Sequence, residues 1–450
     1  MPRTLNIVED VLVRSIALAV RKDWAEETAS VRFNEFVSAA SSLTAAQWKE
    51  FYELSRRHGV SALVFSTVQR LPKEAGVPRD LLFTWFAYSE SVAKRYSKQC
   101  KAASEFAGLM RDNGLGVMIL KGIGLALKYY PSPELRECGD IDVFVYETNP
   151  NRQSVSGEYV HPSGYEKCNS IIENLHNHID RSSEKHSVFT FNGVMVENHK
   201  TFVSDSSKSC RLLNSILNRL IYRDIDQTQS VEPTVTEPIS KSTAMDRDSA
   251  GMSSESSETM LESAAVYPGA DFNALFLLRH TVSHLAYEGV TLHNIVDWGL
   301  FLLKEKDSID WHAYAESLKR TRLFSAFAVF TSIAADVIGA DLNELCGSAA
   351  ASCLRKLYGP DVLSGFGDLA DLKSSSDVFR FAQLKDRVAE EVMTVRLHKE
   401  ASLPFFKRLI AKAKRIFSNK WQYGTVNPDN FWFDALLPSI ISHIKFPDKI

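Results

Sequence analysis

The stretch LKGIGLALKYYPSPELRECGDIDVFVYE, residues 120–147, decides the fold of this chain of 450 residues. It begins with a Lys-Gly-x-Gly turn and ends in strand-forming residues that contain the pair Asp140 and Asp142. Side chains two residues apart on a strand point to the same face of a sheet, so we expect both carboxylates at one spot. Two aligned carboxylates suit a hard divalent cation, Mg²⁺ or Mn²⁺, because such ions prefer oxygen ligands.

The turn ahead of this pair, Lys121-Gly122-Ile123-Gly124, falls where an apolar strand gives way to a short helical piece. Backbone N–H groups at such a point can face phosphate oxygens, and glycine lets the phosphates approach the backbone closely. We therefore expect Lys121, Gly122 and Gly124 to bind the phosphates of a nucleotide. A turn that serves only tight packing is the plain alternative.

Two further candidates follow the acidic pair along the chain. The segment KHSVFTFNGVMVENHKTF predicts a β-hairpin that turns at Asn192-Gly193, and its second strand carries Glu197. This third carboxylate is expected on a strand near the pair, as an additional metal ligand. His199 should point to the same side as Glu197, where it could orient an acceptor or hydrogen-bond Glu197.

Arg136 lies between the glycine turn and the acidic pair. A planar guanidinium suits phosphate oxygens bidentately, so Arg136 is a candidate for contact with a triphosphate. An ion pair with Asp140 or with Glu137 is an equally good interpretation. His280 and His284 share a helix face by their spacing, and we expect them to be packing residues more than metal ligands.

Composition limits the class of protein. With 45% apolar and 24% charged residues the chain has the balance of a globular protein, and a net charge of −3 gives no basic field for tight non-specific nucleic-acid binding. The six cysteines form no C-x-x-C pair, which argues against a zinc ribbon or a disulfide framework. No apolar run approaches the roughly 20 residues that a membrane span needs, so the expected location is the cytoplasm.

The pattern along the chain predicts an α+β fold, with a small mixed β-sheet between helical regions. Residues 1–112 read as an N-terminal helical region, 113–225 as the core with the sheet, and 267–450 as a C-terminal helical domain. Residues 226–266 are rich in Ser, Thr and Glu with almost no aromatics, so they are expected to form a flexible insertion.

Several spaced strings together resemble the uncharacterised nucleotidyltransferase family of the polymerase-β-like nucleotidyltransferase superfamily. The strings are LKG at 120–122, YYP at 129–131, LR at 135–136, GDID at 139–142, KH at 185–186, Glu197, His199, the pair His280 and His284, and DW at 297–298 and 310–311.

The resemblance implies transfer of a nucleoside monophosphate from an NTP such as ATP to an acceptor hydroxyl, with release of pyrophosphate. In such enzymes the first two carboxylates bind both metal ions and the third binds the ion that activates the acceptor; by position these are Asp140, Asp142 and Glu197. The acceptor could be a protein, an RNA, a sugar or a small metabolite. The Gly-Ser turn of the superfamily maps onto Gly122-Ile123, so the serine that commonly touches a phosphate is missing here.

Two other functions compete with this interpretation. A D-x-D glycosyltransferase also holds a metal ion on a nucleotide-sugar with an acidic pair, but it normally needs β-α-β units upstream of the pair, and about 110 mostly helical residues precede it here. A non-catalytic nucleotide-binding or regulatory module with the same fold is the other alternative, which the missing serine makes conceivable.

Overall fold

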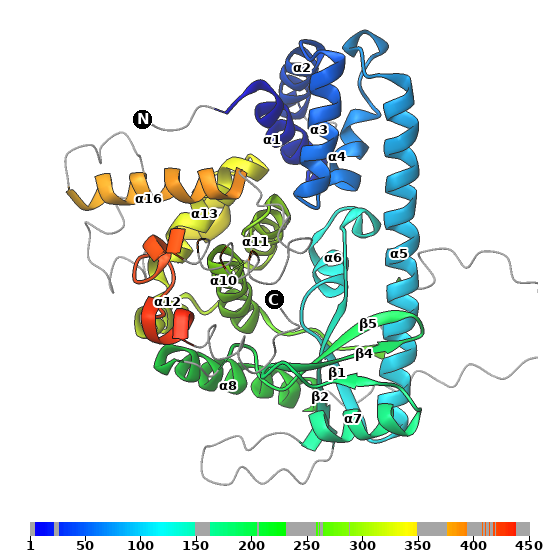
Figure 1. Cartoon of the computed structure of the whole chain (residues 1–450), viewed down its shortest axis with the longest axis vertical. Helices are drawn as coiled ribbons and strands as arrows, with labels where there is room; N and C mark the ends of the chain where they lie inside the picture. The colour runs from blue at the N-terminus through cyan, green and yellow to red at the C-terminus, as the bar shows by residue number, and fades with distance from the viewer. Residues whose placement is uncertain are drawn as a thin grey trace, which may run out of the picture.

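A computed structural model describes residues 5–21, 27–148, 163–204, 207–230, 264–287, 289–348, 376–393 and 420–437, with isolated positions at 258–261 and 407–418. One five-stranded mixed sheet lies among helices (Figure 1). The predicted α+β class is therefore confirmed.

Helices precede the sheet, as the sequence predicts. They are α1 (Ile7–Ala19), α2 (Glu27–Ser41), α3 (Ala45–Arg57), α4 (Ser61–Val68), the 3₁₀ turn η1 (Lys73–Ala75) and α5 (Arg79–Asp112). Thr44 begins α3 with a capping box, because its side chain accepts from the N–H of Gln47 and the Gln47 side chain accepts from the N–H of Thr44. The long helix α5 runs from these helices down along the sheet (Figure 1), so it ties the N-terminal region to the core.

The sheet has the strand order β1-β2-β5-β4-β3. Its strands are β1 (Leu115–Ile119), β2 (Ile141–Glu147), β3 (Ile179–Asp180), β4 (His186–Phe191) and β5 (Val194–His199). Only β2 and β5 pair in parallel. Asn192 and Gly193 adopt φ of 49° and 71°, which is the geometry of a two-residue hairpin turn. The predicted hairpin is confirmed.

The two faces of the sheet meet different partners. On β2, Ile141, Val143 and Val145 pack into a cluster with α5 and with α7 (Ser163–Asn174). The alternate residues Asp142 and Phe144 face the other side, where Phe144 lies 5.4 Å from Phe202 between ring centroids. The period of two along β2 therefore points the carboxylate toward the C-terminal helices.

The C-terminal helices complete the core. They are α8 (Lys208–Ser230), α10 (Ala270–Tyr287), α11 (Leu292–Glu305), α12 (Trp311–Thr321), α13 (Phe324–Ile338) and α16 (Ser376–Met393), followed by η5 (Lys420–Gln422) and the π-helical turn η6 (Phe431–Leu436). Trp298 and Trp311 are buried in this core, and Asp310 caps α12 by accepting from the N–H of His312. Among the described helices none alone is long and apolar enough to cross a membrane; α12 and α13 together meet the length and composition, across a bend of 120°.

The structure differs from expectation at both ends of the predicted insertion 226–266. Helix α8 continues to Ser230, with Ile225 buried, so the helical pattern passes the predicted boundary. Near the other end, Val266 bridges to β1: its N–H donates to Val117 at 3.1 Å and its carbonyl accepts from Ile119 at 2.9 Å. Most of the Ser-rich segment, residues 231–257, lies outside the described residues.

His58 joins the N-terminal helices to α11. It is fully buried, and its Nδ1 accepts a hydrogen bond from the N–H of Leu292 at 3.2 Å. Burial, with the nearby charge of Arg57, lowers the pKa of His58 to about 3. The unfolded chain, in which histidine has a pKa of about 6.5, therefore binds this proton more readily.

We therefore expect the His58 contribution to stability to be fully present above about pH 6.5 and to fall by up to about 1.4 kcal/mol per pH unit as pH drops toward the folded pKa. Urea unfolding at several pH values tests this. His58→Asn should flatten the acid limb. An acid limb of wild-type steepness in His58→Asn would contradict the prediction.

Candidate active site

The carboxylates come together because β2 and β5 are parallel neighbours. Asp142 stands directly opposite Glu197 in the register of these strands, and His199 follows two residues later on the same face. Asp142 is completely buried, while Asp140 is half-buried in the loop that leads into β2. The structure thus brings together Asp142, Glu197 and His199, whereas Asp140 precedes β2 and lies outside this three-residue group of possible metal ligands.

The two oxygens of Asp142 differ in their surroundings. The Lys121 ammonium nitrogen lies 2.9 Å from Oδ1, and Nε2 of His199 lies 3.0 Å from the same oxygen. Oδ2 is buried and has no hydrogen-bond partner among the described residues. A buried carboxylate oxygen without a partner is costly, which makes it suited to a bound cation. Donor atoms of Asp142, Glu197 and His199 all lie within 4.8 Å of one another, so this group fits a metal ion.

Burial and neighbouring charges shift the pKa values of the two aspartates in opposite directions. Burial opposes ionisation of Asp142, but the charges of Lys121 and His199 hold the pKa of its carboxyl well below the usual range. For Asp140, burial and then the charge of Asp142 raise the pKa to about 6, against the opposing effect of Lys121. Burial disfavours a charged His199, yet hydrogen bonds to Asp142 and Glu197 raise its pKa. Asp142 is therefore the permanent negative charge of the site.

The glycine turn holds Lys121 beside the acidic pair. Gly122 has φ +63° and ψ −118°, a region that side chains other than glycine rarely adopt, and a Cβ there would lie 3.3 Å from the carbonyl oxygen of Asp140. The close approach of these backbones therefore depends on Gly122. Helix α6 (Ile123–Tyr129) follows at once.

The contacts of Gly124 favour the alternative in which this part of the turn serves tight packing. Its N–H donates to the carbonyl of Lys121 at 3.2 Å, and it is buried where a Cβ would lie 3.1 Å from the ring of Tyr267. The close packing of α6 against the segment that bridges to β1 therefore explains why a residue without a side chain stands at position 124.

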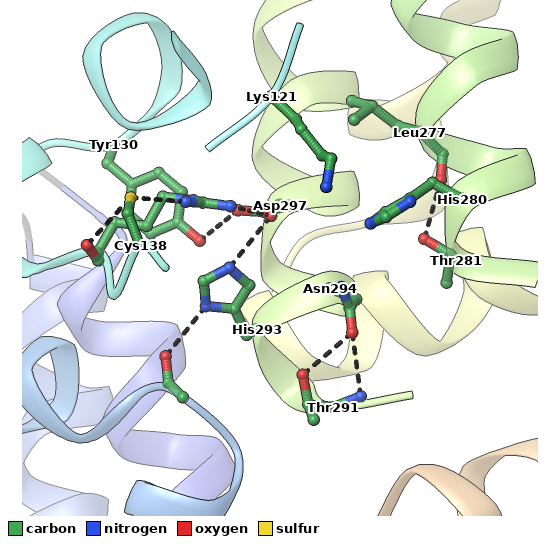
Figure 2. A network of polar contacts seen from close by, with 12 residues as sticks. Lys121, Tyr130, Cys138, Leu277, His280, Thr281, Thr291, His293, Asn294 and Asp297 are labelled. Carbon is green, nitrogen blue, oxygen red and sulfur yellow. Dashed lines mark hydrogen bonds and ion pairs between the residues drawn. The ribbon is translucent and has the colours of Figure 1, made fainter. Parts of the chain in front are cut away.

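A cavity of about 120 Å³ opens beside this turn and the acidic pair. Five of the predicted site residues line it: Lys121, Gly122, Arg136, Asp140 and Asp142. The opposite wall comes from α10 and α11, which contribute His280 and Asn294; Figure 2 shows the Lys121 and His280 side chains pointing into the same space. Gly124, Glu197 and His199 are not part of the lining, so the metal-ligand group reaches the cavity through Asp142.

Arg136 pairs with a residue that the sequence interpretation did not consider. Its Nε and a terminal nitrogen donate to the two oxygens of Asp297 on α11, at 2.9 and 2.6 Å, and both side chains are buried. The expected pairing with Asp140 or Glu137 is wrong. Glu137 instead accepts from the Ser61 N–H at 3.1 Å and from the Tyr88 hydroxyl at 2.6 Å.

These contacts fix the loop that carries Asp140. Asp297 also accepts from the Tyr130 hydroxyl at 2.7 Å and lies 3.5 Å from Nε2 of His293, whose Nδ1 donates to the carbonyl of Gly59 at 3.1 Å (Figure 2). The loop is therefore held to α11 through Arg136, while Glu137 holds it to α4 and α5.

His186 is not among the predicted site residues, although the string KH at 185–186 contains it. His186 on β4 is the register partner of His199, their ring centroids are 5.1 Å apart, and its Nε2 lies 3.7 Å from Glu197. A two-residue turn at Asn192-Gly193 already fixes this pairing, so counting back from the turn would have found it. Nothing local in the sequence indicates the contact of Asp297 with Arg136.

His280 and His284 are half-buried and contact each other through their Nε2 atoms at 2.9 Å. Burial, together with the charge of Lys121, lowers the pKa of His280 well below the usual value. They are not in the three-residue metal group found among the described residues.

Comparison with known proteins gives one result. The model of a family described as uncharacterised nucleotidyltransferase matches residues 44–156 and 158–339, which is well over half of the chain. No curated protein and no solved structure gives a significant match.

Proposed function

The chain belongs to the uncharacterised nucleotidyltransferase family, and from this premise we propose that it transfers a nucleoside monophosphate from an NTP to an acceptor hydroxyl and releases pyrophosphate. One observation carries the proposal: the buried Asp142 stands opposite Glu197, has one oxygen without a partner among the described residues, and lines a cavity that Lys121 also lines. The wall of this cavity presents both cation ligands and a cation for phosphate.

In the proposed site Asp140, Asp142 and Glu197 hold Mg²⁺ or Mn²⁺. A metal ion in this position neutralises phosphate charge and polarises the reacting phosphoryl oxygens. Asp142 and Glu197 are aligned for this role by adjacent strands, which are more rigid supports than loops. Asp140 stands on the cavity wall, on the loop that Arg136 and Glu137 hold in place.

Lys121 and Gly122 are proposed to bind the triphosphate. A cavity of about 120 Å³ is smaller than the roughly 300–1,000 Å³ of pockets that enclose a whole drug-sized ligand, so we place only the phosphates in it. Gly122 lets them approach the backbone, and the Lys121 ammonium can exchange its contact with Asp142 for phosphate oxygens. In the proposed site Arg136 does not contact the phosphates. Its ion pair with Asp297 holds the cavity wall in place, and it contributes to nucleotide binding in this way.

A Lys121→Met variant tests this assignment. Loss of a charged hydrogen-bond donor costs about 1.5–3 kcal/mol, so we expect NTP affinity to fall by about 10- to 100-fold while metal affinity does not fall. Isothermal titration with a non-hydrolysable NTP and Mn²⁺ measures the first, and titration with Mn²⁺ alone measures the second.

Lys128→Met is the matched control, because Lys128 lies on α6, the helix that follows the glycine turn, but pairs with Glu305 outside the cavity lining. Equal NTP affinity in Lys121→Met and Lys128→Met would contradict the role of Lys121.

Transfer itself is tested with each of the four NTPs, labelled at the α-phosphate, together with Mn²⁺ or Mg²⁺ and fractionated cell extract. We expect a macromolecule or small molecule to take up label only when protein and metal are both present. Uptake of sugar from a nucleotide-sugar would favour a glycosyltransferase instead. NTP-dependent stabilisation without any label transfer would favour a non-catalytic binding module. The protein is proposed to act in the cytoplasm, where free thiols such as its five described cysteines persist.

A further inference from the structure

We propose that His199 is a direct metal ligand through Nε2, and that the site thereby selects a transition-metal dication such as Mn²⁺ over Mg²⁺. The inference rests on the proposed function in placing a metal ion at Asp142 and Glu197. It goes further by adding a nitrogen ligand and by naming the kind of ion.

The surroundings of His199 fix which nitrogen can bind a metal. Its Nδ1 lies 3.3 Å from the carbonyl oxygen of Thr201, which can only accept, so Nδ1 carries the proton. His199 is 4% exposed, and Nε2 is the nitrogen directed at Asp142. A backbone carbonyl that accepts from one ring nitrogen, and so leaves the lone pair of the other nitrogen for the ion, is the usual arrangement of a metal-ligating histidine.

The distances agree with a shared ion. Donor atoms that occupy adjacent positions of an octahedral ion with bonds of about 2.1 Å are roughly 3.0 Å apart. Nε2 of His199 lies 3.0 Å from Oδ1 of Asp142 and 3.7 Å from Oε2 of Glu197. The second oxygen of Asp142 is buried without a partner among the described residues, so a ligand position is available there. Adjacent strands β2 and β5 fix all three side chains.

The donor set decides the preferred ion. Mg²⁺ strongly favours oxygen ligands and retains its water, whereas imidazole suits first-row transition metals. Two carboxylates with one imidazole therefore bind Mn²⁺, and the later members of the series, more tightly than Mg²⁺. The competing explanation is a simple ion pair, in which a protonated His199 donates from Nε2 to Asp142 and no metal uses the nitrogen.

Direct metal binding separates these explanations without an activity assay. The full-length protein, stripped with EDTA and free of nucleotide, is titrated with Mn²⁺ while the electron paramagnetic resonance signal of free Mn²⁺ is followed, and Mg²⁺ is then added as competitor. We expect wild type to retain most of its Mn²⁺ in about 100-fold excess Mg²⁺, and His199→Asn to lose at least about 10-fold in Mn²⁺ affinity. His199→Asp should restore binding but reduce the preference, because its ligands are all oxygens.

His186→Asn is the matched control. It removes an imidazole from the register partner of His199 on the same patch of sheet, but His186 is outside the three-residue ligand group. It should keep the Mn²⁺ preference, and circular dichroism should show that all variants fold.

Absence of Mn²⁺ binding to wild type, or an unchanged Mn²⁺ to Mg²⁺ ratio in His199→Asn, would overturn the inference. If wild type selects Mn²⁺ through His199 but transfers no nucleotide, the inference holds and the proposed function fails. If nucleotide is transferred equally well with both ions and His199→Asn binds Mn²⁺ normally, the proposed function holds and the inference about His199 fails.

Discussion

Replacement of Asp142 by Asn should abolish nucleotidyl transfer and metal binding together. Asp142 is the fully buried carboxylate opposite Glu197, and its Oδ2 has no hydrogen-bond partner in the part of the chain that the structure describes. Asparagine would place an uncharged group at this ligand position. Metal ions contribute several kcal/mol of charge stabilisation in phosphoryl chemistry, so we expect a loss of about 10³-fold or more in kcat/KM. Initial rates of pyrophosphate release measure this loss, and Mn²⁺ titration measures the binding.

The same substitution leaves Lys121 and His199 without their counter-charge, so some loss of stability is expected in Asp142→Asn. Asp140→Asn serves as a second variant, because Asp140 is half-buried on the cavity wall and its removal does not strand a buried ion pair. It should also lose transfer while its thermal midpoint stays near wild type. Full activity in either folded variant would remove that aspartate from the proposed site.

Replacement of Asp297 by Ala should give the largest loss of stability in the core. It leaves the buried Arg136 guanidinium and the Tyr130 hydroxyl without their shared acceptor. Breaking a buried ion pair from one side costs about 3–5 kcal/mol, because the remaining charge stays buried without compensation. Urea unfolding measures the change. We also expect lower activity, since Arg136 belongs to the loop that carries Asp140.

Two further variants show whether the unpaired charge causes this loss. The double replacement Arg136→Met with Asp297→Leu should recover most of the stability, because apolar residues of similar volume often replace a buried pair at little cost. Glu35→Ala breaks the exposed pair with Arg14 and should cost less than about 1 kcal/mol. A loss in Asp297→Ala no larger than that in Glu35→Ala would show that the buried pair does not support the fold as described.

The sequence allowed local features to be predicted where one short-range rule decides them. The Asn192-Gly193 turn, the period of two along β2 and β5 and the Thr44 cap each depend on neighbours a few residues away. Asp142, Glu197 and His199 follow from the same rules, because strand periodicity and the pairing of two strands place them. Asp140 lies in the loop before β2, where strand periodicity does not fix its position.

The rest depends on contacts between residues far apart in the chain. Arg136 and Asp297 are 161 positions apart, and no local pattern indicates which of several acidic residues a buried arginine will meet. The bridge of Val266 to β1 likewise depends on a single strand-like residue at the end of a polar segment, too short to give a periodic signal. The family resemblance identified the strings that contain Arg136 and Asp297, but not the contact between them.

The central claim, nucleotidyl transfer from an NTP at the Asp142 cavity, is tested most directly by following two labels on the same NTP. One label is placed on the α-phosphate and the other on the γ-phosphate, and both are followed with wild type and with Asp142→Asn in the presence of Mn²⁺. The account predicts that the α-label passes to the acceptor while the γ-label leaves as pyrophosphate in equal amount, and that neither moves in the variant. Transfer of the γ-label to the acceptor, or equal transfer by Asp142→Asn, would contradict it.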